Sequence, residues 1–201
     1  MTNQTTDSRL HLLKIAKGLF FSQGYSSVST DMLAREAGVS KSTIYKHFQS
    51  MSGLFDEVVR LEIEYFETGI DLHSTCREEF VEMLIRYGVN LMRFLNKKDV
   101  IQLDCLMLEE ARDHPENTKH FFEKTYEATM LRLGELIEPG IHKAWIMHEI
   151  SAVEAAEMLI GMWKGSRCYK AQFRIKKVPF RNIESWSKKC VRVLVGETCT
   201  D

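Results

Sequence analysis

The sequence has little proline and no regular arrangement of cysteine. Three prolines in 201 residues leave long stretches in which a helix can run without interruption. The cysteines are five in number, widely separated and without a CxxC pair: Cys76, Cys105, Cys168, Cys190 and Cys199. This pattern argues against both a disulfide framework and a zinc ribbon, so we expect reduced thiols.

Long apolar runs and catalytic motifs are missing as well. No uninterrupted apolar segment approaches the length that crosses a bilayer, and none follows basic residues near the beginning of the chain. The seven histidines form no HExxH, and the chain contains no GxSxG, phosphate-binding loop or dinucleotide fingerprint. We expect a cytoplasmic protein that is not an enzyme, contacts no membrane and uses neither a cofactor nor a metal.

What is present is helical periodicity and an uneven distribution of charge. Hydrophobic residues make up 44% of the chain and recur with the 3.6-residue period of helices, which predicts an all-α fold. The net charge of −1 hides a split, because residues 1–50 hold six cations and three anions, a balance of +3. The split favours a basic nucleic-acid-binding module joined to an acidic body, although a solvated surface fits the same charges.

The first fifty residues read as three short helices. RLHLLKIAKGLFFSQG is amphipathic and stops at Gly24. In VSTDMLAREAG, Ser29 can cap a second helix, which we expect to end at Gly38 in a left-handed conformation. Ser40 can cap a helix in the same way, which predicts a third helix that begins at Lys41.

The third helix has one apolar and one polar face. Ile44 and Phe48 lie four residues apart and must face the two preceding helices. The outward face then carries Lys41, Ser42, Thr43, Tyr45, Lys46 and His47. Two short helices joined by a glycine turn, the second with a small, polar and cationic face, are typical of a helix-turn-helix that enters the major groove of DNA. The hydroxyls of Ser29 and Ser40 can receive phosphate oxygens, while a solvated surface helix is the alternative interpretation.

Residues 9–58 resemble the N-terminal DNA-binding domain of the tetracycline-repressor (TetR/AcrR) family of bacterial regulators. The resemblance is carried by LLKIAKGLF, by GY at 24 and 25, by LAREAGVSKSTIYKHF at 33–48 and by SMSGLF at 50–55. It implies an all-helical dimer whose first three helices bind DNA. We accordingly expect a helix-turn-helix domain over residues 1–50, and a helical effector-binding and dimerisation domain over residues 51–201.

The resemblance also implies roles for the residues that match the family motif. These roles are a phosphate contact for Thr30, entry into the groove for Lys41, Ser42 and Thr43, backbone contacts for Tyr45 and His47, and a base or phosphate contact for Lys46. Relatives commonly carry lysine where this chain has Met51. We therefore expect one phosphate contact fewer per subunit, which flattens the salt dependence of binding by about 0.9 log units per contact.

Further helices are predicted over 54–71, 75–96, 99–113, 115–138, 151–173 and 181–198. In the helix at 54–71, Leu54, Val58, Leu61 and Tyr65 share one apolar stripe. Pro115 suits a first helical turn, and SAVE at 151–154 is a capping box. Pro139 either ends or kinks the helix at 115–138.

The middle of the chain, chiefly LDCLMLEEARDHPENTKHFFE at 103–123, resembles the AefR-like branch of the family more loosely. Methionine and aromatic side chains there and beyond predict adaptable walls for a small apolar or aromatic effector. The expected ligand-binding residues are Tyr87, Leu91, Met107, Tyr126, Met130, Met162 and Trp163. For each residue taken alone, core packing is the simpler interpretation.

The last two helices are expected to pair with their copies in a homodimer. Gly161 and Gly165 lie four apart and would let two helices approach closely, between subunits or within one chain. Residues 164–192 hold ten cations and a single anion, Glu184. The simplest interpretation is a solvated face, with an anionic-ligand entrance or a membrane surface as alternatives.

Together these features predict a repressor that a small ligand releases from a palindromic double-stranded DNA operator. The rival hypothesis is a ligand-binding helical dimer that has lost operator binding and acts through another protein. The missing cation at position 51 favours this rival.

Overall fold

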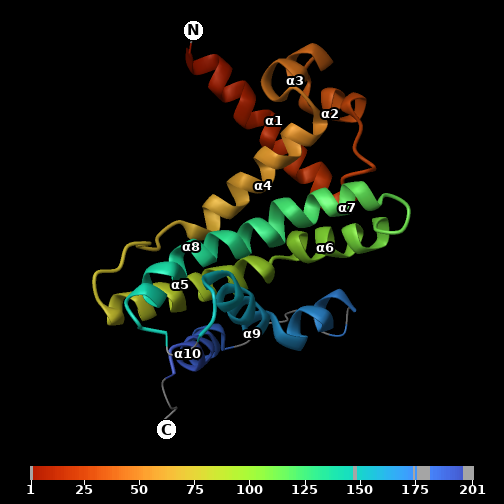
Figure 1. Ribbon diagram of the computed structural model, residues 1–201. Helices are drawn as coiled ribbons and strands as arrows, with labels where there is room; N and C mark the ends of the chain where they lie inside the picture. The colour runs from red at the N-terminus through yellow and green to blue at the C-terminus, as the bar shows by residue number, and fades with distance from the viewer. Residues whose placement is uncertain (1, 147–148, 174, 176–181, 197–201) are drawn as a thin grey trace. The chain divides into compact units, whose positions relative to one another are not determined.

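Helices form all the regular structure in the described part of the chain, as the sequence predicts. The computed structural model describes residues 2–146, 149–173, 175 and 182–196 (Figure 1). The helices are α1 (Thr2–Gln23), α2 (Thr30–Ala37), α3 (Lys41–Phe48), α4 (Met51–Glu67), α5 (Arg77–Leu95), α6 (Lys98–Glu110), α7 (Pro115–Phe122), the π-helical turn η1 (Glu123–Glu127), α8 (Ala128–His142), α9 (Ala152–Gln172) and α10 (Ile183–Leu194). They form two compact units, the first made of Met1–Glu64 and Lys98–Thr125, the second of Tyr65–Lys97 and Tyr126–Asp201.

The first unit combines the three N-terminal helices and most of α4 with α6 and α7. The Ser26 hydroxyl, in the turn after α1, donates to Glu110 Oε2 at 2.7 Å, and Asn117 Nδ2 donates to Ser26 Oγ at 2.7 Å. On α4, Asp56 Oδ1 lies 2.6 Å from His120 Nε2 of α7. The turn after α1 and helix α4 are therefore held to α6 and α7 by hydrogen bonds, while the functional boundary at residue 50 stays a prediction.

The second unit is built from α5, α8, α9 and α10. Its centre holds Tyr87 of α5 and Trp163 of α9, which are fully buried. Gly88 makes room for the indole, since a Cβ there would lie 2.3 Å from Trp163 Cε2. The buried Ser187 of α10 donates its hydroxyl to the Ile85 carbonyl at 2.8 Å, so α10 is fastened to α5.

Two predicted helices differ from the observed ones. Helix α4 ends at Glu67, and Tyr65 is 67% exposed although it was expected on the apolar stripe. Its neighbour Phe66 is buried instead, with its ring edge-on to Tyr87 at 5.4 Å. The expected helix over 115–138 is interrupted by the π-turn η1, and Pro139 lies inside α8, which continues to His142.

The capping box at Ser151 is confirmed, because its hydroxyl accepts from Glu154 N while the Glu154 carboxylate accepts from Ser151 N. The expectation that Gly161 and Gly165 lie on one side of an unbroken helix is wrong. Gly165 has φ 46° and ψ −153°, a conformation that interrupts α9. Helix α10 spans Ile183–Leu194, and positions 181, 197 and 198 of the predicted helix lie outside the described residues.

Candidate nucleic-acid interface and ligand site

The turn between α2 and α3 has the local structure that its sequence predicts. Ser29 Oγ accepts from Met32 N at 3.1 Å and caps α2. Gly38 follows α2 with φ 67° and ψ 30°, the left-handed conformation that glycine adopts without a steric penalty. Ser40 Oγ accepts from Thr43 N at 3.2 Å and caps α3.

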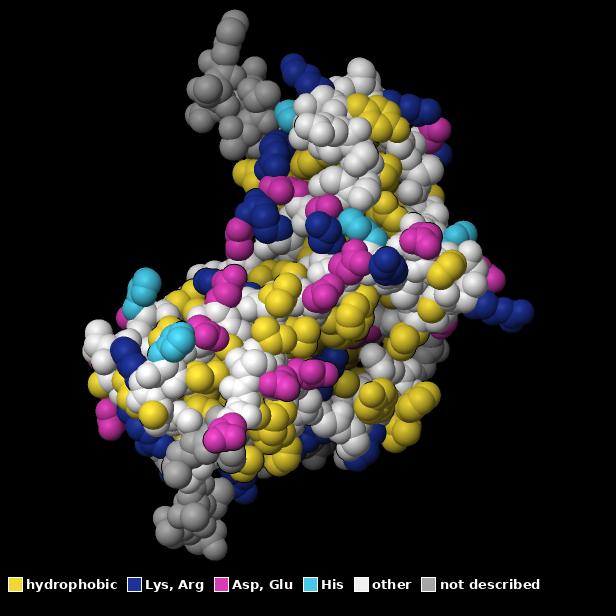
Figure 2. Space-filling model, viewed as in Figure 1, with side chains coloured by type: hydrophobic (Ala, Val, Ile, Leu, Met, Phe, Trp, Pro, Cys, Tyr) yellow, Lys and Arg dark blue, Asp and Glu magenta, His cyan; other side chains and the backbone are white. Residues whose placement is uncertain are grey.

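Helix α3 presents a polar face to solvent and buries an apolar one. Ile44 is fully buried and Phe48 is 6% exposed, which holds the short helix against its neighbours. Of the predicted outward residues, Lys41, Ser42, Tyr45 and Lys46 are exposed, whereas Thr43 and His47 are half-buried. Lys and Arg side chains flank the surface of α2 and α3 on the face shown in Figure 2.

The cations of this surface are not equally available. Lys41 Nζ lies 2.6 Å from Asp31 Oδ1 on α2, and both side chains are more than half exposed. Lys46 makes no ion pair within the described residues. Asp31 lies ten residues before Lys41 in the sequence, and this separation gives no sign of the pairing.

Two further cations of the first fifty residues form ion pairs with acidic residues of α4. Arg9 Nη2 lies 2.6 Å from Glu57 Oε1, and Lys17 Nζ lies 2.6 Å from Glu62 Oε1. The basic surplus of this segment is therefore partly neutralised by acidic residues that follow it in the chain.

Hydroxyl groups cluster at the two helix N-termini. Thr30 Oγ1 and Tyr45 Oη share a hydrogen bond of 3.1 Å between α2 and α3. Ser40 Oγ also lies 2.8 Å from Ser42 Oγ and 2.9 Å from Thr43 Oγ1. Exposed hydroxyls beside the positive end of a helix can donate to an anion, so the arrangement suits phosphate oxygens.

The start of α4 departs from the family pattern at Met51, and its local structure explains why position 53 is a glycine. Met51 is the first residue of α4, and Ser50 Oγ accepts from Gly53 N at 2.9 Å. A Cβ on Gly53 would lie 2.6 Å from the Phe48 carbonyl oxygen. The glycine thus permits the close turn between α3 and α4.

Among the predicted ligand residues, Tyr87 and Trp163 form one cluster. Their rings are stacked with centroids 6.3 Å apart. Tyr87 Oη and Trp163 Nε1 are buried and have no hydrogen-bond partner among the described residues. Burial, with a smaller effect of the Glu67 charge, raises the pKa of Tyr87, so its hydroxyl remains a donor.

The other predicted ligand residues are distributed over both units. Leu91 and Met107 are buried, while Tyr126, Met130 and Met162 are half-buried. Met107 belongs to the first compact unit and the other six to the second. Lys164 Nζ lies 4.1 Å from the ring centroid of Tyr126, so this ring already has a cationic neighbour.

The basic stretch at 164–192 is only partly a solvated face. Arg167 lies over the Trp186 ring at 4.2 Å from its centroid, and its Nη1 is buried. Lys170, Lys188 and Lys189 are exposed. Lys164 and Arg192 are half-buried, while Arg174, Lys176, Lys177 and Arg181, like Cys199, lie outside the described residues.

In the part of the chain that the structure describes, no three His, Cys, Asp or Glu side chains are grouped as metal ligands. None of the helices described there combines the length and apolar character of a membrane span.

Comparisons with known proteins agree with this geometry. The family model described as bacterial regulatory proteins of the tetR family matches residues 12–58. The chain is 41% identical over 183 residues to the HTH-type transcriptional regulator AcrR of Shigella flexneri, covering 87% of this chain and 85% of that protein. It is 25% identical to the regulator YdgC of Bacillus subtilis over 81% of this chain and 80% of that one.

Solved structures show the same fold. A TetR transcriptional regulator from Agrobacterium tumefaciens superposes with a TM-score of 0.74 at 20% identity, over 94% of this chain and 93% of that one. The Flavonoid-responsive Regulator FrrA superposes with a TM-score of 0.72 at 21% identity, over 95% of this chain and 96% of that one.

Proposed function

The chain belongs to the TetR/AcrR family of bacterial DNA-binding transcriptional regulators, and from this membership we propose that it is a repressor released from its operator by a small ligand. The observation that carries the proposal is the structure of α3. The helix is capped by Ser40 and anchored by the buried Ile44 and Phe48, so that its polar face points outward, as entry into a groove requires.

Base and phosphate contacts are proposed for different parts of this face. Ser42 and Thr43, near the start of α3, read base edges, and Lys46 contacts a base or a phosphate. Lys41 exchanges Asp31 for a DNA partner. An exposed ion pair of this kind contributes about 0–1 kcal/mol, so a phosphate can replace the carboxylate at little cost.

A shared phosphate is proposed for the hydroxyls of Thr30 and Tyr45. They lie 3.1 Å apart, close enough for both to donate to one phosphate group. The capping hydroxyls of Ser29 and Ser40 accept backbone N–H groups, and a phosphate contact is proposed for each of them. His47, half-buried on the last turn of α3, completes the proposed backbone contacts.

A homodimer through α9 and α10 is proposed because these helices leave large apolar side chains uncovered. On α9, Met158 is 50% and Tyr169 is 62% exposed, and Val193 on α10 is 56% exposed. Exposed apolar side chains that gather into one patch mark interfaces, and these three are proposed to belong to such a patch. A two-fold dimer would place its α3 helices in successive major grooves about 34–36 Å apart on a palindromic operator.

A small aromatic ligand is proposed to bind around Tyr87 and Trp163. Buried polar groups normally have hydrogen-bond partners. An aromatic molecule that bears an acceptor would give a partner to Tyr87 Oη and Trp163 Nε1. The neighbour named as flavonoid-responsive supports this ligand class. A release of about 100-fold requires a difference of about 2.7 kcal/mol in ligand affinity between two conformations.

The test is a fluorescence-anisotropy titration of a labelled palindromic duplex at about 50 and about 200 mM salt. Steep salt dependence with sequence preference supports the repressor. Binding that is absent or insensitive to salt supports the rival, a ligand-binding dimer without an operator.

Two variants separate the proposed contacts. Lys46→Ala weakens binding to all duplexes alike if Lys46 serves phosphate, whereas Thr43→Ala weakens binding at selected bases. If neither changes operator affinity, the placement of α3 in the groove is wrong.

A further inference from the structure

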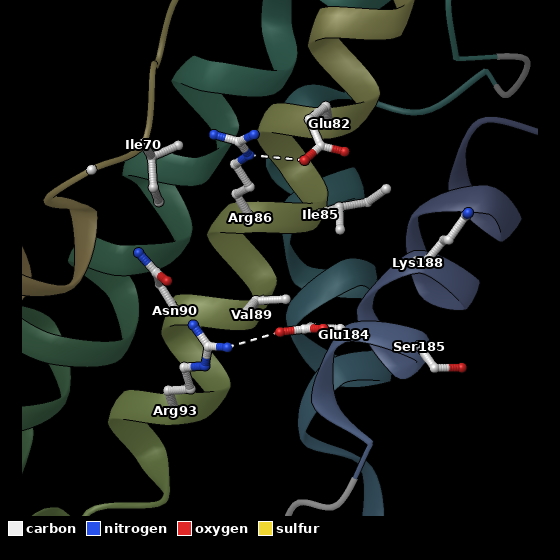
Figure 3. A pocket seen from close by; sticks show the side chains of 11 residues that line it. Ile70, Glu82, Ile85, Arg86, Val89, Asn90, Arg93, Glu184, Ser185 and Lys188 are labelled. Carbon is white, nitrogen blue, oxygen red and sulfur yellow. Dashed lines mark hydrogen bonds and ion pairs between the residues drawn. The ribbon is translucent and has the colours of Figure 1, made fainter.

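A hollow of about 510 Å³ lies on the second unit (Figure 3). Its walls come from α5, from the first turns of α10 and from the segment after α4. None of the seven predicted ligand residues lines this hollow.

The hollow contains more basic than acidic side chains. Arg86 and Arg93 come from α5 and Lys188 from α10, against Glu82 and Glu184. Two ion pairs use both acids, since Arg86 Nε lies 2.8 Å from Glu82 Oε1 and Arg93 Nη2 lies 2.9 Å from Glu184 Oε1 (Figure 3). Lys188 forms no ion pair within the described residues, so one positive charge remains uncompensated.

In the ion pair between Arg93 of α5 and Glu184 of α10, another anion can replace the carboxylate. The Arg93 side chain is 58% and the Glu184 side chain is 77% exposed. Pairs this exposed contribute little to stability, and a dissolved anion competes with the carboxylate on similar terms. An incoming anion would gain Arg93, and Lys188 on the α10 wall would add a second positive charge to the lining.

The lining also has an apolar part. Ile85 and Val89 come from α5, and Ile70 comes from the segment after α4. A second hollow of about 290 Å³ shares Asn90 and Arg93 with the first, and its other walls include the rings of Tyr65 and Phe94 (not drawn in Figure 3). The two hollows therefore adjoin at Asn90 and Arg93, where charged side chains lie beside apolar and aromatic residues. The first hollow is called the groove below.

We propose that this groove binds a small organic anion, a carboxylate on a flat apolar body, with its charge between Arg93 and Lys188. The apolar body lies against Ile85 and Val89, where contact with the side chains replaces contact with water. This site is separate from the one proposed around Tyr87 and Trp163, and it does not depend on operator binding.

The test is calorimetric titration of the full-length protein with 2-naphthoate, with 2-naphthamide as the neutral analogue. We expect naphthoate to bind more tightly than the amide, with an advantage that shrinks as salt is added. Lys188→Gln should weaken naphthoate binding about three- to fivefold, as loss of one exposed charge contact allows. Glu184→Gln should strengthen it, because Arg93 no longer has a competing carboxylate.

Lys189→Gln is the matched control, since Lys189 is the next residue of α10, is exposed and does not line the groove. It should leave the affinity unchanged. The proposal is overturned if naphthoate fails to bind at millimolar concentration, if the amide binds equally well, or if Lys188→Gln matches Lys189→Gln. A loss of affinity in Tyr87→Phe alone would place the anion in the buried cluster and equally overturn it.

Discussion

At the scale of single residues, the structure changes how the cations of α3 are understood. Lys41 and Lys46 look equivalent in the sequence, but Lys41 is paired with Asp31 at 2.6 Å, and Lys46 has no such partner among the described residues. With α3 in the proposed position on DNA, the carboxylate would both compete for Lys41 and repel the phosphate backbone. Asp31 is thus expected to limit DNA affinity without contacting a base.

Asp31→Asn should tighten operator binding about two- to fivefold at low salt, because the change frees Lys41 and removes one repulsive charge. Anisotropy titration at two salt concentrations measures the effect. Glu36→Gln, an equal change of charge at another exposed position of α2, controls for the general effect of charge. Equal gains in both variants would show that the Lys41 pairing plays no specific part.

Gly88→Ala should destabilise the protein by about 1–3 kcal/mol, since overpacked cores must shift side chains or backbone. The new methyl would lie 2.3 Å from Trp163 Cε2 and 2.5 Å from Ser187 Oγ. Urea unfolding measures the change. Gly18→Ala on α1 is the control, because no atom lies within 4 Å of its added Cβ and the change should stabilise α1 by about 0.5–1 kcal/mol. Equal stability of the two variants would contradict the packing described for Trp163.

At the scale of helices, α1 and α4 are joined by charge. Arg9 reaches Glu57 and Lys17 reaches Glu62, each at 2.6 Å. Hydrogen bonds from Arg60 and then Arg9 lower the pKa of the Glu57 carboxyl from 4.5 to about 2. Because the folded state favours the ionised carboxylate, this contribution to stability is complete above about pH 4.5.

The same contribution should be lost as the pH falls from 4.5 towards 2, where Glu57 takes up a proton in the folded protein. Melting temperature followed over this range should therefore decline more steeply in the wild type than in Glu57→Gln, which carries no titrating group at this position. Parallel declines would mean that Glu57 does not act through its charge.

At the scale of the whole molecule, the exposed apolar side chains of α9 and α10 are those that we propose to be covered by a second subunit. Operator binding by a two-fold dimer multiplies two weak half-site contacts, so a loss of dimerisation weakens DNA binding even when α3 is intact.

Tyr169→Glu should accordingly convert the dimer to a monomer and reduce operator affinity at least tenfold, since it places a charge within the apolar contact. Sedimentation measures the oligomeric state, and anisotropy measures binding. The control Leu131→Glu changes an exposed apolar residue of α8, outside the proposed interface. A Tyr169→Glu protein that stays dimeric would exclude this part of α9 from the interface.

Local signals predicted local structure well. The serine caps at Ser29 and Ser40, the left-handed Gly38 and the inward pair Ile44 and Phe48 are all as expected, because each depends on residues only a few positions apart. The periodicity of α4 was less informative. Tyr65 and Phe66 are both aromatic, and which of them is buried depends on Tyr87, which is distant in the sequence.

The sequence by itself determined the helical class, the caps and turn of the helix-turn-helix, and the polar outer face of α3, since these follow from short-range sterics and hydrogen bonding. Only the tertiary structure decided that Asp31 neutralises Lys41, that Gly165 breaks α9, and that Arg93 and Lys188 face a common groove. Those outcomes depend on contacts between different helices and on the packing around Gly165. Composition and periodicity do not predict such contacts.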